Sequence, residues 1–475
     1  MKKTVFSFFS IVCFLGAFAQ NDSIITVHEW GTFTSLTTSG GKQLTGLYLD
    51  EEALPPFVYN LDMRGATDSQ AKIITPKNCE LKNVTVKMET PVLYFYSPKE
   101  MDVKVKVGFK GGLISQWYPQ RSGGSEGITK CTKPIDFTGG AQEGFIEWAG
   151  HLQKPGIAEK YTEPALNNPV WMSPRATKSN LITTKDTLAQ TEKYLFYRGI
   201  GNFEVQMKTY FNEHGLFAIT NNNSNDEVLY AMVYHKPMNG PAEIWWAGSM
   251  GKGVMVTMYP KAVQGLTVER VKTNFKNALV AAGLYKDEAE AMLKTWQHSY
   301  FDVPGLKVFW IVPRPVTDAI LPLQIEPLPL STQRVLVGRS EVLTPNFEEF
   351  IYQVYQNASE DVFFGDRYIA AYRECHEQQK TRTRMEDKTT EKLYAYPNYL
   401  NGKVHVIAKV AAPEGDSVQV EMQTVAGVSV SSQMVALNKK GYFYHPFYYL
   451  GQPAGEYVVK VRYKDRMLTE KVLIK

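Results

Sequence analysis

The sequence predicts an α+β fold class: a β-rich, sandwich-like N-terminal body with a smaller helical portion, followed by a C-terminal immunoglobulin-like β-sandwich. Three observations support this prediction. Period-two alternation of apolar and polar residues recurs through the first half of the chain, as in 103–109. Helical spacing of apolar residues begins only after Tyr259. The last eighty residues return to short alternating runs separated by turns, which is typical of a two-sheet sandwich.

The first residues predict a secretory signal peptide over 1–19. Lys2 and Lys3 precede an apolar stretch over 5–15, and Ala17-Phe18-Ala19 supplies a small-residue cleavage site. This apolar stretch is too short for a membrane span, and no later segment offers the roughly 18 uninterrupted apolar residues that a spanning helix needs. We therefore expect an exported chain without a transmembrane segment.

Composition restricts the partners. The formal net charge of +4 on 475 residues is too small to indicate a nucleic-acid partner. No phosphate-binding loop, dinucleotide fingerprint or paired metal-ligand pattern occurs, so the cofactor is unknown and no metal ligand is predicted. Three cysteines follow the signal peptide. Cys79 and Cys131 can form a disulfide in an oxidising compartment, which would leave Cys375 over, or all three can be free buried thiols.

The N-terminal body is expected over 20–260. Alternating residues predict strands at 84–88 and 103–109, and an apolar run predicts a buried strand at 92–96. We expect Thr90-Pro91 to separate the strand at 84–88 from the strand at 92–96, because proline cannot donate to a strand ladder. Short connections containing Pro or Gly then indicate an antiparallel sheet or sandwich.

The helical portion is expected over 261–377, packed on the body. Apolar spacing predicts four helices, at 268–282, 287–298, 345–357 and 366–377, with Thr344 as the N-cap of the third. A buried strand is predicted at 306–312, followed by an extended, proline-stiffened segment over 313–329. Residues 378–392 are too polar to support a core, so we place a linker there.

Four residues are candidates for catalysis. His28 and Glu29 stand together at the start of a strand, and imidazole and carboxylate groups serve proton transfer. Adjacent strand residues point to opposite faces, so these two cannot easily share a small site. Glu89 could act in proton transfer with His28, while Arg339 would orient an anion. The alternatives are a buried edge strand for His28-Glu29 and a structural salt bridge for Glu89 and Arg339.

The C-terminal domain is expected over 393–475 and contains a recognisable series of motifs. Tyr396-Pro397-Asn398 opens it, Gly427 lies between two strands, and Pro453-Ala454-Gly455-Glu456-Tyr457 leads into alternating Val and Lys residues. In this order the segment over 396–475 resembles the C-terminal sorting domain of type IX secretion cargo. One departure is Tyr399, where the family usually has a second proline. The resemblance implies recognition by the type IX secretion machinery.

The body contains the segment His28-Glu29-Trp30-Gly31-Thr32-Phe33-Thr34, which resembles the HEWGTFT motif of uncharacterised secreted bacterial proteins. Further similarity lies in 88–96 and 335–339. This resemblance implies no activity. We therefore expect a secreted or outer-surface protein, reaching the periplasm by Sec export, with a binding or structural role toward a glycan or protein. The alternative is a secreted hydrolase acting on polysaccharide or peptide.

Overall fold

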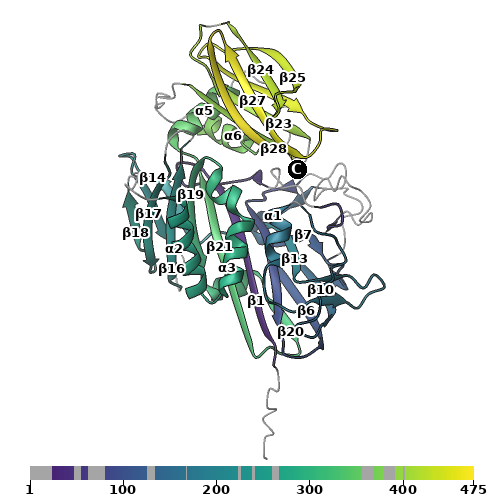
Figure 1. Cartoon of the computed structure of the whole chain (residues 1–475). Helices are drawn as coiled ribbons and strands as arrows, with labels where there is room; N and C mark the ends of the chain where they lie inside the picture. Colours follow the sequence, from purple (N-terminus) through teal and green to yellow (C-terminus); the bar gives the residue numbers. More distant parts are fainter. Residues whose placement is uncertain are drawn as a thin grey trace, which may run out of the picture.

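The computed structural model describes residues 24–47, 55–61, 81–125, 134–166, 168–222, 226–237, 241–258, 267–355, 367–378, 391–398, 402–413 and 415–474. The expected signal peptide, residues 379–390 of the linker expected over 378–392, Cys79 and Cys131 lie outside these residues. At its two ends the expected linker is wrong, because Gln378 belongs to α6 (Ile369–Gln378) and Lys392 begins a strand. Cys375, on α6 (Ile369–Gln378), is a free thiol. Figure 1 shows a large lower body and a smaller upper unit formed by the C-terminal strands.

One curved sheet organises the body, and β1 lies near its centre. Its main path contains strands from most of residues 26–342, in the order β12 (Thr191–Glu192), β11 (Ile182–Thr184), β10 (Glu143–Leu152), β7 (Gly112–Tyr118), β13 (Leu195–Gly201), β5 (Val86–Tyr96), β1 (Thr26–Thr37), β21 (Ser331–Val342), β19 (Gly305–Val312), β16 (Val228–Lys236) and β17 (Glu243–Met250). β6 (Met101–Lys110) joins β10, and β20 (Leu323–Glu326) joins β6. The segments expected on either side of residue 260 therefore contribute strands to the same sheet.

Three sequence segments become three adjacent strands at the centre of this sheet. β1 pairs antiparallel with β5 and parallel with β21, so the HEWGTFT segment lies between 88–96 and 335–339. Close approach accounts for one glycine of the motif: a Cβ on Gly31 would lie 2.9 Å from the Cα of Pro91. A side chain there would collide with the neighbouring strand.

The expected break at Thr90-Pro91 is wrong, because β5 runs without interruption through both residues. The ladder between β5 and β1 shifts register between Trp30 and Thr32, and Thr90 has a positive φ of 46°. A bulge of this kind lets a strand pass a proline while the flanking residues remain paired.

The two faces of the sheet have different covers. On one face, Val27 and Phe33 of β1 share a core with Val105 of β6 and Trp148 of β10, so the sheet curls over itself. On the other face, helices α2 (Val268–Ala281) and α3 (Lys286–Thr295) pack on the sheet, as Figure 1 shows. The molecule is thus β-rich with several sheets, and it fits a sandwich-like body.

The remaining helices connect the body to the C-terminal unit. α5 (Pro345–Tyr355) begins after Thr344, whose Oγ1 accepts from the backbone N of Phe347 at 3.2 Å, as expected for an N-cap. Phe350 and Ile351 of α5 share a core with Leu36 of the body and with Ile407 and Tyr442 of the C-terminal unit. The prediction of an extended segment over 313–329 is partly wrong, because α4 (Arg314–Ile320) forms at its start. Pro315 lies in the first turn of α4, where no backbone donor is needed.

The C-terminal unit consists of two antiparallel sheets around one shared core. One sheet contains β22 (Lys392–Asn398), β23 (Lys403–Lys409) and β26 (Tyr442–Tyr448). The other runs in the order β25 (Ser429–Ala436), β24 (Ser417–Thr424), β27 (Gly455–Tyr463) and β28 (Arg466–Ile474). Val406, Val420, Val459 and Val472 are among the buried residues that fill the space between the sheets.

Short elements complete the described structure. A separate three-stranded sheet contains β14 (Met207–Phe211), β15 (Phe217–Asn221) and β18 (Met255–Met258), and β4 (Leu81–Lys82) pairs with β9 (Ile135–Asp136). β2 (Gln43–Leu44), β3 (Tyr59–Asn60) and β8 (Gly123–Gly124) extend the large sheet. The short helices are η2 (Thr138–Gly140), α1 (Pro169–Met172), η3 (Ser173–Arg175) and the π-helical turn η4 (His298–Asp302).

Candidate functional site

His28 and Glu29 lie on opposite faces of β1, as the alternation of a strand requires. His28 faces the helices, and its Nδ1 lies 2.8 Å from Oε2 of Glu288 on α3. Glu29 faces the other side, where the Nε of Arg334 donates to its Oε2 at 2.6 Å and the hydroxyl of Tyr197 donates to its Oε1. The two candidates therefore belong to two different buried clusters.

Glu288 is the centre of the His28 cluster. Its side chain is fully buried, and it accepts hydrogen bonds from the hydroxyl of Tyr96 at 2.7 Å and from the backbone N of Tyr285 at 2.7 Å. The rings of Tyr285 and Tyr96 lie 4.3 Å and 5.3 Å from that of His28. Burial and the nearby Glu288 raise the pKa of Tyr96, so its phenol keeps the proton that it donates.

The same two tyrosines form part of the lining of a surface hollow with a volume of about 570 Å³. Lys178, Lys286, Asp287 and Glu290 complete the lining. Tyr285 is 45% exposed, so its ring is available to a ligand, whereas His28 behind it is only 2% exposed. Two ammonium and two carboxylate groups surround two aromatic rings. We call this feature the Tyr96–Tyr285 hollow.

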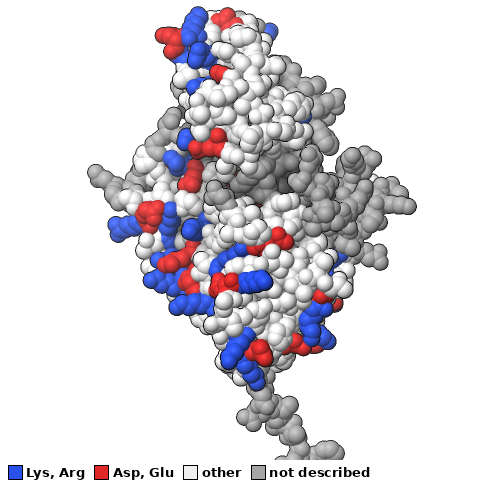
Figure 2. Space-filling model, turned by 45° about the vertical axis from the view of Figure 1, so that its right-hand side comes forward, with Lys and Arg blue, Asp and Glu red and all other residues white. Residues whose placement is uncertain are grey.

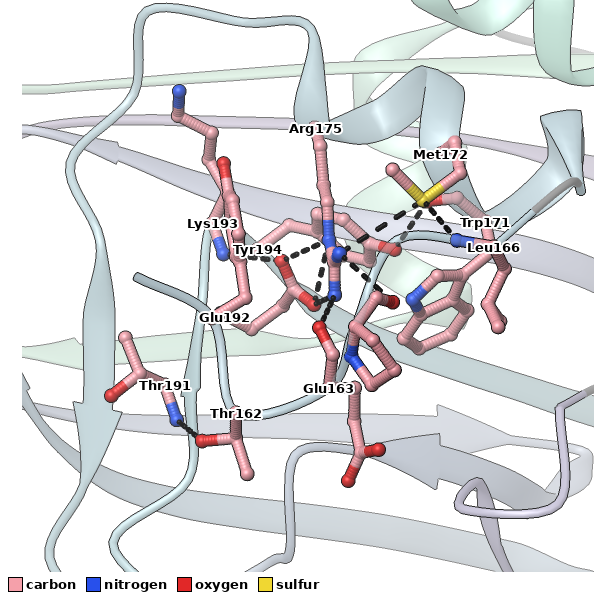
Figure 3. Close-up of polar contacts among 12 residues, drawn as sticks. Thr162, Glu163, Leu166, Trp171, Met172, Arg175, Thr191, Glu192, Lys193 and Tyr194 are labelled. Atoms are coloured by element: carbon pink, nitrogen blue, oxygen red, sulfur yellow. Dashed lines mark hydrogen bonds and ion pairs between the residues drawn. The ribbon is translucent and has the colours of Figure 1, made fainter. Parts of the chain in front are cut away.

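A buried ion pair fixes the segment before Lys178. Arg175 at the end of η3 binds Glu192 through Nε at 3.0 Å and through Nη2 at 2.7 Å, and Figure 3 shows both groups enclosed by the surrounding residues. Tyr194 beside them donates to the backbone O of Trp171 at 2.9 Å. The backbone N of Lys178 then donates to Asp287 at 3.0 Å, which joins this segment to α3. One wall of the hollow is therefore held in place by the body.

Glu89 and Arg339 form a further cluster, on the face of the sheet that carries α2 and α3. Arg339 Nη2 lies 3.3 Å from Oε1 of Glu89 and 3.4 Å from Glu341, which also binds Arg367. Lys87 lies 3.6 Å from Glu89. Burial alone would raise the pKa of Glu341, but Arg367, Arg339 and Lys307 together lower it to about 2. The expected structural salt bridge between Glu89 and Arg339 is therefore present.

The structure brings Glu89 and Arg339 together but separates them from His28 and from Glu29. Across the β1–β5 ladder, His28 pairs with Tyr94 and Thr32 pairs with Glu89. Four strand residues separate the two positions, which corresponds to roughly 13 Å. His28 contacts α3, Glu89 contacts Arg339, and Glu29 lies on the opposite face. In the part of the chain that the structure describes, no three His, Cys, Asp or Glu side chains are grouped to hold a metal ion.

Sequence reasoning missed Glu288, Tyr96 and Tyr285. Glu288 occupies the first turn of α3 and accepts from the backbone N of Tyr285, the residue just before the helix. An acidic residue at this position is a known helix-start signal, and it is present in the sequence. Nothing in the sequence indicates that the same carboxylate also binds a strand residue 260 positions earlier.

Comparisons with known proteins add little. No protein-family profile and no curated protein matches this chain. Among solved structures, the crystal structure of Salmonella alpha-2-macroglobulin reacted with methylamine is 10% identical over 83% of this chain, with a TM-score of 0.16. This chain spans 23% of the length of that protein. A score this low carries no argument about fold or function. Among the described helices, none is long and apolar enough to cross a membrane.

Proposed function

We propose that this chain is an exported binding protein whose body takes a glycan in the Tyr96–Tyr285 hollow. In this proposal the C-terminal unit is an immunoglobulin-like sorting domain that the type IX secretion machinery recognises. The protein reaches the periplasm by Sec export and is then secreted or attached to the outer cell surface.

The lining of the hollow is the observation that carries the glycan proposal. Its volume lies in the range of small-ligand sites, and its two aromatic rings are accompanied by four charged side chains. A sugar ring offers an apolar face for packing on an aromatic ring and hydroxyl groups for hydrogen bonds to Lys and carboxylate groups. Since the two signs of charge are balanced in the lining, a neutral sugar fits better than an anionic one. Figure 2 likewise shows both signs of charge interspersed on the face it presents.

Burial favours binding over hydrolysis. His28 and Glu288 are 2% and 0% exposed, and Glu288 already accepts from Tyr96 and from the backbone of Tyr285. A general acid or base must come within hydrogen-bond reach of the substrate. Here the aromatic rings stand between these groups and the hollow, so we assign them to positioning the rings.

A binding screen tests the glycan site. Neutral oligosaccharides would be titrated against the full chain by isothermal calorimetry, and the best ligand would be titrated against Tyr285→Ala. We expect the variant to weaken binding at least tenfold. Tyr448→Ala serves as the matched control, because Tyr448 is an exposed tyrosine on the C-terminal unit. Binding that Tyr285→Ala leaves unchanged rules out the hollow, and the absence of any glycan ligand removes the proposal.

The sorting proposal is supported by where the motif residues lie. Tyr396 and Pro397 lie on β22, at the start of the C-terminal unit. Gly427 has a φ of +85° in the turn between β24 and β25, and Gly455 begins β27. Residues 391–475 would be fused to a periplasmic reporter in a host that has the type IX machinery, with a fusion ending at 454 as control. We expect only the complete unit to carry the reporter out of the cell; retention of both fusions contradicts the proposal.

A further inference from the structure

The sheet that contains β22, β23 and β26 is buried on both of its faces. On β23, Val404 and Val406 face the core between the two sheets of the C-terminal unit. His405 and Ile407 alternate with them, so they point the other way, and both are also fully buried. The outer face of an antiparallel sandwich usually meets water and carries polar side chains. In this unit, the outer face of one sheet is instead covered by protein.

Aromatic side chains make up most of this outer face. Cross-strand pairing places Tyr394 of β22 and Tyr444 of β26 on either side of Ile407. Next to them, the ring of Tyr396 stacks on that of His405 at a distance of 5.4 Å. Left open to water, these side chains would form one contiguous patch of the kind that soluble monomers rarely expose. The face therefore requires a cover.

The cover is the helix pair α5 and α6. The ring of Phe350 lies 5.5 Å from the rings of both Tyr394 and Tyr442. The ring of Tyr355 lies 5.5 Å from that of Tyr444. Figure 1 shows the two helices between the C-terminal strands and the body. Aromatic rings thus pack on aromatic rings across the whole contact.

Two polar contacts fix the position of the sheet on the helices. Asn438, in the turn between β25 and β26, donates through Nδ2 to the backbone O of Gln353 at 2.8 Å. The hydroxyl groups of Tyr355 and Tyr396 lie 3.2 Å apart. Because all four groups are neutral, these contacts set the orientation and depend little on salt.

The other side of the helix pair is held on the body. Glu348 of α5 accepts from the backbone N of Ser39 at 2.5 Å, and Arg367, just before α6, pairs with Glu341 of β21. Leu36 of β1 belongs to the same core as α5. The helix pair is therefore part of the body, and its contact with the sheet joins two separately packed parts of the chain.

We propose that the C-terminal unit is docked on the body as a tightly bound subunit, so that the two parts stay together when the chain between 378 and 391 is cut. An enclosed aromatic side chain buries roughly 150–250 Å². Six such rings meet in this contact, which brings its total buried surface to the order of the roughly 1,200 Å² of stable protein complexes. Cleavage alone then does not free the body from a surface that holds the C-terminal unit.

Controlled cleavage of the full chain tests the proposal. A site for a sequence-specific protease, flanked by Gly and Ser residues, is inserted within 379–390, and complete cleavage is verified on a denaturing gel. In analytical size exclusion at about 1 μM, we expect the two parts to elute together and to separate only in denaturant. The measurement uses purified protein without glycan or secretion machinery, so its outcome is separate from those of the glycan and sorting proposals.

A charge placed in the contact should separate the cut parts. Ile407→Asp buries a carboxylate between the sheet and α5, outside the core that lies between the two sheets, and should weaken the association at least a hundredfold. Met434→Asp adds the same charge to β25, where the side chain is 66% exposed, and should leave the parts together. Tyr444→Asp, at a half-buried position of the contact, serves as a second variant in case Ile407→Asp does not fold.

Three outcomes would overturn the proposal. The first is separation of the unmodified parts at about 1 μM, which would show that only the peptide chain holds them together. The second is co-elution of the cut Ile407→Asp and Tyr444→Asp parts, which would place the attachment elsewhere. The third is separation of the Met434→Asp parts, which would show that the added charge acts through the fold of the C-terminal unit and not through the contact.

Discussion

Removing Arg334 should destabilise the body more strongly than removing its partner Glu29. Both Arg334 and Glu29 have fully buried side chains, and their Nε–Oε2 distance is 2.6 Å. Arg334 also donates through Nη1 to Asp318 at 2.8 Å and to the backbone O of Leu321 at 2.6 Å. In Arg334→Met, Glu29 would remain buried with Tyr197 as its neutral donor.

The magnitude follows from this loss of a partner. Breaking one side of a buried ion pair typically costs about 3–5 kcal/mol, because an uncompensated charge stays in the interior. Since Arg334 has three acceptors, Arg334→Met should fall at the upper end of this range. Glu29→Leu leaves Arg334 paired with Asp318, which is partly exposed, so we expect the lower end. The double variant should cost clearly less than the sum of the two, because no unpaired charge remains.

Urea unfolding followed by tryptophan fluorescence measures these costs selectively. All eight tryptophans lie between residues 30 and 310, so the signal reports the body and not the C-terminal unit. A cost below about 1 kcal/mol for Arg334→Met, or additive single and double variants, would refute the reasoning. Glycan binding should be unaffected in folded variants, because Glu29 faces away from the hollow.

Three further predictions follow from single positions. Burial raises the pKa of Glu470 from 4.5 to about 7, so its contribution to stability is present below pH 4.5 and is lost as the pH rises through 7. The unfolding free energy of Glu470→Gln should equal that of the unmodified chain near pH 5. At pH 8 it should be higher by only about 1–2 kcal/mol, because the group is partly exposed. Urea titration at both pH values measures the difference, and equal stability at pH 8 would contradict the prediction. Burial lowers the pKa of Lys307 from 10.5 to about 7, so this lysine destabilises the folded chain increasingly as the pH falls from 10.5 through 7. Lys307→Met should therefore raise the unfolding free energy by about 1–2 kcal/mol at pH 7 and by less at pH 10. A gain that grows with pH would show the sign to be wrong. Gly31→Ala should lower the unfolding free energy by about 1–3 kcal/mol in urea, because the added Cβ would collide with Pro91. Gly251→Ala should be nearly neutral, because the nearest atom would lie 3.7 Å from the added Cβ. Equal effects of the two variants would remove the steric explanation.

Local patterns allowed much of the fold to be predicted. The spacing of Val271, Phe275 and Leu279 marks the buried stripe of α2, and Thr344 marks the start of α5. These features depend on neighbours within a few residues, so the sequence contains all the information they need. The prediction failed at Pro91, because the bulge that accommodates it depends on Gly31 in another strand.

The candidate site was harder to predict, for the same reason. The sequence identified His28 as a group able to transfer protons, but its partner Glu288 lies 260 residues away. Of its ring neighbours, Tyr285 comes from the same segment as Glu288 and Tyr96 from a further strand. The opposite orientations of His28 and Glu29 did follow from strand geometry alone. Convergence of distant segments is decided by sheet order, which a single sequence does not display.

The parallel pairing of β1 with β21 has a consequence for how the chain is made. Twelve successive residues of each strand are matched, and the partners lie 305 positions apart. During synthesis, most of the body is therefore made before β21 is available to pair with β1. The closure of so long a loop makes folding slow. A fragment that stops short of Ser331 leaves β1 without this neighbour and its apolar side chains without their cover. Along the proposed Sec route, which a chain crosses unfolded, such late closure is an advantage, because it delays folding of the body until β21 has been made.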